Sequence, residues 1–433
     1  MNLKDKNTRS FAKKILYNIL YRSIFFSDAF FIHKKEFEEF SDNDKKYIYQ
    51  LVFTVLRRSG QINKIINLYT KKPIKNPEVN LILKLGVAQI LFLRTPNYAS
   101  VNQTVELVKN NLKPFRPLVN AVLRKISDNI NNFDEILNDP NNTLPTWLLK
   151  KWRAYFGKDI TTSIAESILS EPYIDITKKI SKEKIFSDLN TITLPNDTIR
   201  IIKAQKISDL PSYHEGRWWV QDAAASIPAT LLINKMKKIK DKSIVLDVCA
   251  APGGKTAQLI NAGLDVISVD KNKSRVNLMK ENLKRLDFNT SVICSNFLNW
   301  KPDYTNVKGI LLDAPCSGTG TLRKNPDIIW NRDKSEISKL SNLQIKLIKH
   351  SLKILRPGGY LVYSVCSIEP EEGINIAKKV ALWANVKLSF IKSYEMPELQ
   401  ESITTDGFAQ VLPFYWKNLG GLDGFFIARF EKK

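Results

Sequence analysis

The feature that most constrains the fold is a regular alternation of apolar, β-branched segments with helical segments after about residue 243. Five segments have the composition of buried strands: SIVLDVCA, LDVISVD, SVICSN, VKGILLDAP and GGYLVYSVC. The stretches between them, such as KSRVNLMKENLKRL, carry apolar residues at helical spacing. This alternation predicts a doubly wound α/β sheet with right-handed crossovers. Ligands of such sheets bind beyond the carboxyl ends of the strands, so the residues that follow each strand are candidates for a site.

The region before the sheet predicts two further domains. Residues 1–135 read as successive amphipathic helices and carry almost no strand signals, which predicts an all-α domain. Its first apolar stripe consists of Phe11, Ile15, Leu16, Ile19 and Leu20. A later helix is expected to be capped by Asp44 and to end at Gly60. Residues 145–235 mix helical spacing with short β-like pieces, so we expect a small α+β connector before the sheet domain at 236–433.

The charge of the chain indicates a polyanionic partner. The 433 residues contain 66 Lys and Arg against 43 Asp and Glu, a net charge of +23. Such an excess favours nucleic acid through counterion release and electrostatic steering. The alternative is a compositional bias, because the chain is rich in Lys, Asn and Ile.

Several classes of protein are disfavoured by composition. No apolar run approaches the roughly 20 residues of a membrane span, and the start MNLKDKNTRS is unlike a secretory signal. We therefore expect a cytoplasmic protein with no membrane partner, and a monomer. Four cysteines without a CxxC pair and three histidines predict neither a disulfide scaffold nor a metal site.

The first strand leads into a glycine turn that has the properties of a ligand-binding loop. The turn comprises Cys249, Ala250, Ala251, Pro252, Gly253, Gly254 and Lys255. Consecutive glycines let the backbone approach a ligand, and the helix that follows offers free N–H groups. A P-loop would need glycine at Cys249, and no GxGxxG is present, so nucleotide phosphate and nicotinamide sites are disfavoured. The alternative is an ordinary strand–helix turn.

Four side chains with chemically useful groups follow other strands. Asp270 ends the second strand, where a carboxylate can accept hydrogen bonds from ribose hydroxyls. Asp313 and Cys316 follow the fourth strand, and Cys366 follows the fifth. A lone cysteine is usually buried and inert. Two of them at the ligand-binding edge fit reactive thiols better.

The motifs DVCAAPGGKT, DAPCSGTGTLRKNPDIIW and YSVCSIEPEEG resemble those of the Nol1/Nop2/Sun family of RNA 5-methylcytosine methyltransferases. SVNQTVELVKNN and LVNAVLRKI are similar to a NusB-like RNA-binding domain, and GRWWVQDAAAS resembles the linker that joins such a domain to a catalytic domain. Within the family, this arrangement resembles the bacterial enzymes that act on 16S rRNA. The resemblance implies a Rossmann-like methyltransferase fold, S-adenosyl-L-methionine as methyl donor, and 16S rRNA or a small-subunit precursor as partner.

The resemblance also implies roles for the site residues. Residues 249–255 would surround the methionine part of the donor, and Asp270 its ribose. Asn296 stands where the family usually has an aspartate at the adenine, so the hydrogen-bond acceptor remains but the charge is lost. Asp313 would border the donor and assist at N3 and the amino group of the base.

The chemistry requires a nucleophile because C5 of cytosine is itself a poor one. A thiolate that adds to C6 makes the ring an enamine whose C5 can accept a methyl group. The family pattern makes Cys366 this nucleophile and Cys316 the helper in its release. Methylation of tRNA or 23S rRNA, a DNA cytosine methyltransferase and a non-catalytic NusB-like RNA-binding factor remain as alternatives.

Overall fold

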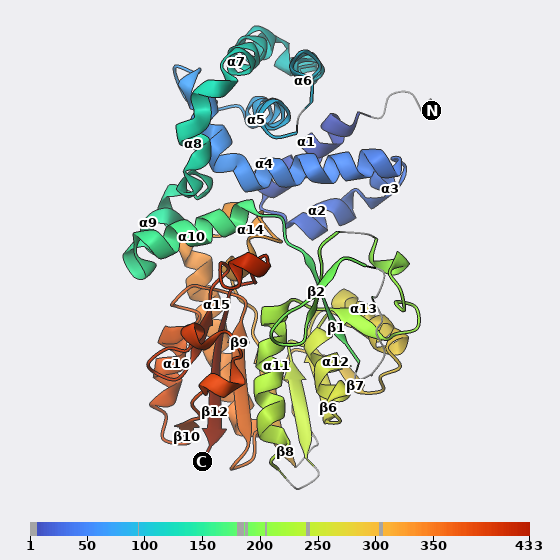
Figure 1. The fold of residues 1–433 in the computed structure, drawn as a ribbon, viewed down its shortest axis with the longest axis vertical. Helices are drawn as coiled ribbons and strands as arrows, with labels where there is room; N and C mark the ends of the chain where they lie inside the picture. The colour runs from blue at the N-terminus through green and yellow to red at the C-terminus, as the bar shows by residue number, and fades with distance from the viewer. Residues whose placement is uncertain are drawn as a thin grey trace. The chain divides into compact units, whose positions relative to one another are not determined.

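The chain folds into two compact units in the computed structural model (Figure 1). The structure describes residues 7–93, 95–179, 186, 189–203, 206–239, 243–302 and 306–433. The first unit contains residues 1–171 and 322–332, and the second contains 172–321 and 333–433. The unit boundary at 171/172 falls inside the segment that we expected to be a connector. No helix of the described ranges is long and apolar enough to cross a membrane.

The first unit is helical throughout its described residues up to 171, apart from its turns. Its helices are α1 (Thr8–Arg22), α2 (Phe26–Ile32), α3 (Lys34–Glu38), α4 (Asp42–Leu68), α5 (Pro77–Leu91), α6 (Asn97–Val105), α7 (Arg116–Asp128), α8 (Asp134–Asn138), α9 (Thr146–Phe156) and α10 (Lys158–Leu169). Helix α1 begins where the Asn7 side chain accepts from two backbone N–H groups. The predicted stripe is buried at Phe11, Ile15, Leu16 and Ile19 and packs into one core with α4, α5 and α7. The prediction of an all-α N-terminal domain is confirmed.

Two predictions for helix α4, its cap and its end, are wrong. Its cap is Ser41, whose hydroxyl accepts from the backbone N–H of Asp44, so Asp44 lies in the first turn. The helix also continues through Gly60 to Leu68. Glycine is needed at position 60 for packing, because a Cβ there would lie 2.2 Å from the carbonyl oxygen of Asn142. Position 60 is therefore a glycine because another backbone segment approaches it closely, and not because a helix ends there.

A segment from far along the chain completes the helical unit. Residues 322–332 contain the short helix α14 (Ile328–Asn331). The Trp330 indole packs against the helical core and donates to the carbonyl oxygen of Leu56 at 2.8 Å. The Asp327 carboxylate accepts from the backbone N–H of Phe26 at 3.0 Å. The helical unit is therefore discontinuous in sequence.

The second unit contains the predicted doubly wound sheet. Its strand order is β10-β12-β9-β8-β5-β6-β7, and β11 pairs with β12. The strands are β5 (Ile244–Val248), β6 (Asp265–Asp270), β7 (Ser291–Cys294), β8 (Val307–Asp313), β9 (Tyr360–Val365), β10 (Val386–Leu388), β11 (Ala409–Val411) and β12 (Phe425–Lys432). The five strands predicted from sequence pair in parallel, whereas β12 runs in the opposite direction and pairs antiparallel with β9, β10 and β11. Successive strands extend the sheet from β5 to β6 and β7 on one side and then from β8 to β9 on the other. The strand order therefore reverses between β5 and β8, the position at which such sheets bind ligands.

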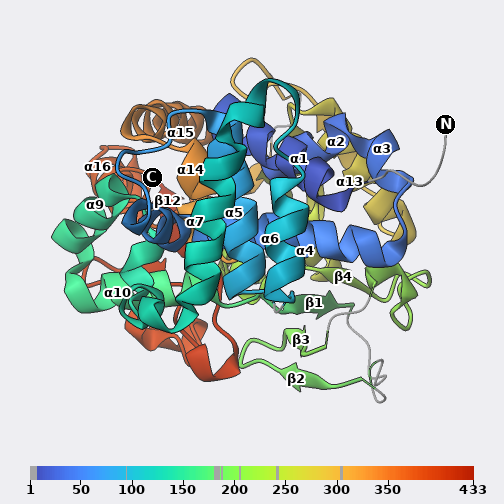
Figure 2. The ribbon, with the colours of Figure 1, turned by 90° about the horizontal axis from the view of Figure 1, so that it is seen from above.

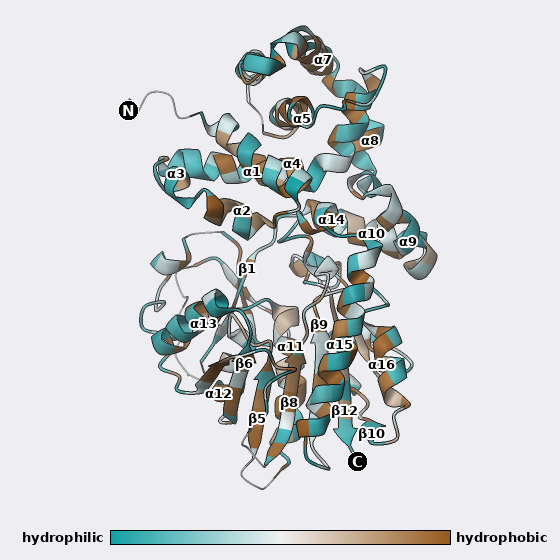
Figure 3. Ribbon diagram, turned by 180° about the vertical axis from the view of Figure 1, so that it is seen from behind, coloured by the Kyte–Doolittle hydropathy of each residue, from teal (hydrophilic) through white to brown (hydrophobic). Residues whose placement is uncertain are grey.

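Helices cover both faces of this sheet. Helices α15 (Lys334–Ile354) and α16 (Ile374–Ala381) pack on one face. Helices α11 (Ala223–Met236) and α12 (Gly254–Asn261) pack on the other, and α13 (Lys273–Arg285) lies against α12. Because both faces are buried, the central strands are apolar along their length, and β5 and β8 are largely brown in Figure 3. The predicted doubly wound α/β architecture is confirmed.

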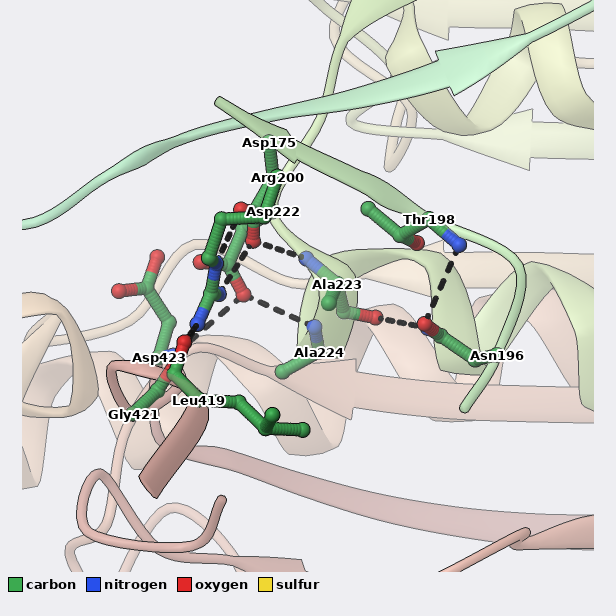
Figure 4. A network of polar contacts seen from close by, with 10 residues as sticks. All are labelled: Asp175, Asn196, Thr198, Arg200, Asp222, Ala223, Ala224, Leu419, Gly421 and Asp423. Carbon is green, nitrogen blue, oxygen red and sulfur yellow. Dashed lines mark hydrogen bonds and ion pairs between the residues drawn. The ribbon is translucent and has the colours of Figure 1, made fainter. Parts of the chain in front are cut away.

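A small antiparallel sheet precedes the large one in the second unit. Its order is β2-β3-β1-β4, from strands β1 (Ile174–Lys178), β2 (Thr191–Thr193), β3 (Ile199–Ile201) and β4 (Trp218–Val220), which Figure 2 shows side by side. A buried Arg200 on β3 fastens this sheet to the C-terminal segment (Figure 4). It makes two hydrogen bonds to the Asp175 carboxylate and donates to the carbonyl oxygens of Leu419 at 2.7 Å and Gly421 at 2.8 Å.

Candidate active site

The glycine turn lies directly after β5, as predicted. Cys249 and Gly253 both have positive φ angles, 62° and 101°. At Gly253 a Cβ would also lie 2.8 Å from Cγ of Met279, so both the backbone conformation and the space require glycine. Helix α12 begins at the next residue. The turn therefore leaves β5 sharply and places the first N–H groups of α12 at the ligand-binding edge.

Two carboxylates lie beside this turn. Asp270, at the end of β6, accepts from the backbone N–H of Ala251 at 3.1 Å and of Asn272 at 2.8 Å. Each carboxylate oxygen retains a lone pair for a ligand hydroxyl. Asp247, on β5, is fully buried, and its Oδ2 accepts from the Thr256 hydroxyl at 2.5 Å. Its Oδ1 has no hydrogen-bond partner among the described residues.

Burial raises the pKa of Asp247 to about 7, and the Thr256 hydrogen bond and Lys255 oppose that shift. A buried acceptor without a partner is costly, so a bound donor at Oδ1 would be stabilising. Asp247 is not among the site residues predicted from the sequence. Its position could have indicated a role, because it is the first residue of the motif DVCAAPGGKT, two positions before the turn begins.

An ion pair links the turn to β8. The Lys255 ammonium lies 2.6 Å from Oδ2 of Asp313. The other oxygen of Asp313 accepts from the Ser364 hydroxyl of the neighbouring strand β9 at 3.0 Å. Burial alone would lower the pKa of Lys255, but Asp313, Asp247 and the Cys366 thiolate charge raise it above its ordinary value. Lys255 therefore stays protonated at neutral pH and places a positive charge beside Asp313 and the end of β9.

The two predicted cysteines come together. Cys316 follows β8, Cys366 follows β9, and their Sγ atoms are 3.4 Å apart. Both thiols are partly buried. The hydrogen bond to Cys366, together with burial, raises the pKa of the Cys316 thiol well above its ordinary value. Cys316 thus keeps its proton at neutral pH and can donate it in a hydrogen bond to its neighbour.

The other two cysteines differ from this pair. Burial, with the nearby charge of Asp270, raises the pKa of Cys249 to about 12, so this thiol is unreactive at neutral pH. Cys294, on the edge strand β7, is exposed. Asn296 follows β7 and is exposed, and its Oδ1 accepts from the backbone N–H of Leu298 at 3.2 Å. Its proposed contact with adenine stays a prediction.

A buried carboxylate holds the two cysteine-bearing loops together. Glu372 accepts from the backbone N–H of Ser317 at 2.9 Å and from the Gln344 amide at 3.1 Å. It also accepts from the hydroxyls of Ser317 and Ser367. These serines directly follow Cys316 and Cys366, so one side chain ties both loops. Sequence reasoning missed this role, although Glu372 lies within YSVCSIEPEEG.

Oxidised glutathione should link Cys316 to Cys366 in the native protein, with reduction of glutathione to its thiol. We expect Glu372→Ala to slow formation of this disulfide about tenfold or more. The substitution removes the acceptor of four hydrogen bonds that hold the two loops, and a buried donor left without a partner costs roughly 1–3 kcal/mol. Glu372→Gln keeps one acceptor oxygen for Ser317 and Gln344 and should stay near wild type. Mass spectrometry of the alkylated protein measures the rate, with Cys294 as the internal reference. Equal rates in all three proteins would contradict the role of Glu372.

The structure thus brings together the turn 249–255, Asp270, Asp313, Cys316 and Cys366 at the carboxyl edge of β5, β6, β8 and β9. This edge offers a cradle for a ligand with hydroxyl and donor groups beside a pair of thiols. The described residues contain no group of three or more potential metal ligands.

Both the N-terminal and the C-terminal parts of the chain are similar to known protein families. Residues 235–431 match the family described as 16S rRNA methyltransferase RsmB/F, and residues 6–128 match the NusB family. The ribosomal RNA small subunit methyltransferase B of Shewanella oneidensis is 29% identical, over 98% of this chain and 99% of its own. The probable ribosomal RNA small subunit methyltransferase B of Synechocystis is 30% identical, over 90% of this chain and 92% of its own.

Among solved structures, the protein PH0851 has a similar fold. It superimposes with a TM-score of 0.72 at 21% identity and covers 99% of each chain.

Proposed function

The chain belongs to the 16S rRNA methyltransferase RsmB/F family, and from that membership we propose that it methylates C5 of a cytosine in 16S rRNA through a covalent bond between Cys366 and C6 of the base. The observation that carries the proposal is the pair of thiols 3.4 Å apart beside the Lys255–Asp313 ion pair. The family relation supports the S-adenosyl-L-methionine dependence and the rRNA substrate. The geometry of the thiols supports the cytosine chemistry.

The residues at the edge of the sheet fit S-adenosyl-L-methionine. Asp270 has lone pairs free for the ribose hydroxyls, and the unpartnered Oδ1 of Asp247 suits the ammonium group of the methionine part. Bound in this cradle, S-adenosyl-L-methionine supplies an electrophilic methyl group.

The protein side chains divide the remaining work. The Cys366 thiolate attacks C6, and the resulting electron density at C5 forms the new bond to the methyl carbon. Asp313, held by Lys255 and Ser364, accepts a hydrogen bond from the amino group and stabilises a proton at N3, and so assists the addition. A water molecule at the site then takes the proton from C5, the electrons of that C–H bond form the C5–C6 double bond again, and the C6–S bond breaks with its electron pair returning to the Cys366 sulfur. The protonated Cys316 donates a hydrogen bond to the departing Cys366 thiolate, which makes it a better leaving group.

Bisulfite sequencing of rRNA and tRNA tests the proposal directly. A strain without the gene should lose one 5-methylcytosine in 16S rRNA, and the wild-type gene should restore it. A gene encoding Cys366→Ser should not restore it, because a serine hydroxyl is far less nucleophilic than a thiolate. Loss of 5-methylcytosine from tRNA or 23S rRNA would redirect the substrate. An unchanged pattern in every RNA would contradict the proposed function.

A further inference from the structure

The flank of the methyltransferase sheet carries a concentrated positive charge that the proposed chemistry does not use. Residues 271–285 contain six Lys and Arg and a single acid, Glu281. They include helix α13, which is largely teal in Figure 3. Its apolar side is buried through Val276, Met279 and Leu283. The helix therefore packs on the sheet by one side and exposes the other as a cationic surface.

Three lysines of α13 form a stripe. Lys273, Lys280 and Lys284 are exposed and occupy positions i, i+7 and i+11, which lie on one side of a helix. The helical rise places them roughly 10 Å and 6 Å apart along the axis. Among the residues that the structure describes, none of the three forms an ion pair. A solvated helix face of ordinary composition alternates charge signs, and this stripe does not.

A cleft continues the stripe at its C-terminal end. It has a volume of about 300 Å³ and is lined by Lys280, Lys284, Asp287, Phe288, Asn289 and Thr290, among others. The half-buried Phe288 ring contributes an aromatic surface, and the Lys179 ammonium lies 4.5 Å from its centroid. An aromatic ring surrounded by cations is the combination with which proteins hold single-stranded nucleic acid.

Further cations crowd the same place. The Arg285 guanidinium lies 4.2 Å from the centroid of the Tyr213 ring and donates to the carbonyl oxygens of Tyr213 and Trp218. Burial lowers the pKa of Lys179, Asp287 opposes that shift, and Arg217 and Arg285 add to it. The positive charges thus repel one another in the free protein, and a polyanion would relieve that repulsion.

We propose that the backbone of single-stranded RNA next to the target cytosine lies along the Lys273–Lys280–Lys284 stripe, with one nucleotide in the cleft at Phe288. This inference rests on the proposed RNA substrate. The lysines neutralise successive phosphates, so they position the RNA and carry no sequence preference. Helix α13 starts three residues after Asp270, so the stripe leads away from the donor site.

A matched pair of triple variants tests the stripe. Lys273→Gln, Lys280→Gln and Lys284→Gln together should weaken binding of a short single-stranded RNA. The slope of log K against log salt should fall by about 2, since each phosphate contact in a single strand contributes roughly 0.7. The control combines Lys346→Gln, Lys353→Gln and Lys387→Gln, which remove the same charge from exposed positions on α15 and β10. The control should change the slope by less than the roughly 0.7 that a single phosphate contact contributes.

The cleft is tested by Phe288→Leu, which keeps an apolar side chain but removes the aromatic face. RNA affinity should fall roughly fivefold or more with an unchanged salt slope, the size of one lost stacking contact. Binding of S-adenosyl-L-methionine should be unchanged in all variants, which shows that the catalytic unit is folded.

The outcomes separate this inference from the proposed function. If the wild-type protein shows no salt-dependent RNA binding, the RNA substrate itself is contradicted. If it binds RNA but the stripe variant has wild-type affinity and slope, or the control loses as much, the site on α13 is overturned. The site would also be overturned if the stripe variant weakened binding of an RNA duplex, or of phosphatidylserine vesicles, more than it weakened binding of the single strand.

Discussion

Cys366→Ala should form no covalent adduct with 16S rRNA and should transfer no methyl group. Without a thiolate at C6, C5 of cytosine never becomes nucleophilic, so the loss of activity should be complete within detection. Cys316→Ala should behave in the opposite way. Attack and methylation proceed, but the departing thiolate loses the hydrogen bond that its neighbour donates across 3.4 Å. A methylated protein–RNA species should therefore accumulate.

One denaturing gel compares the two variants after incubation with S-adenosyl-L-methionine and labelled RNA. The accumulated species should survive denaturation and disappear after nuclease digestion. Cys294→Ser serves as the control, because this exposed cysteine on β7 lies outside the thiol pair. The mechanism of DNA cytosine methyltransferases would reverse the pattern, with Cys316→Ala inactive. An adduct from Cys366→Ala would rule out the roles assigned here.

Arg200→Met should destabilise the protein by about 3–5 kcal/mol, because it leaves a buried carboxylate without its counter-charge. Arg200 Nε lies 2.6 Å from Oδ1 of Asp175, and both side chains are 1% exposed. The carbonyl oxygens of Leu419 and Gly421 would lose their donor as well. Urea unfolding measures the effect as a lower midpoint at an unchanged slope.

The double variant Asp175→Leu with Arg200→Met is the informative control. It removes both charges, so no unpaired carboxylate remains in the interior, and much of the lost stability should return. If the single and double variants were equally destabilised, the cost would come from lost packing and lost backbone hydrogen bonds. A change of less than about 1 kcal/mol in Arg200→Met would contradict a structural role for the network in Figure 4.

The sequence predicted those parts of the site that lie within short motifs. Positions 249–255, Asp270, Asp313, Cys316 and Cys366 each follow an apolar strand, and parallel strands place their carboxyl ends at one edge. Strand recognition was therefore enough to gather them. Asp247 and Glu372 were missed, because pattern alone does not distinguish a buried, functional carboxylate from a solvated one. Their roles depend on burial and on partners such as Gln344 that are distant in sequence.

By itself, the sequence determined the all-α and doubly wound architectures, the placement of the candidate residues at the carboxyl ends of the parallel strands, and the family of the chain. These properties depend on periodicity and local motifs, which are readable along the chain. Only the tertiary structure decided that residues 322–332 belong to the helical unit and that Gly60 lies inside a helix. It also decided the 3.4 Å spacing of the thiols and the anchoring of β3 by Arg200. The physical reason is that each depends on packing between residues that are tens to hundreds of positions apart in the sequence, where a distant neighbour supplies the core, the close backbone or the hydrogen-bond partner.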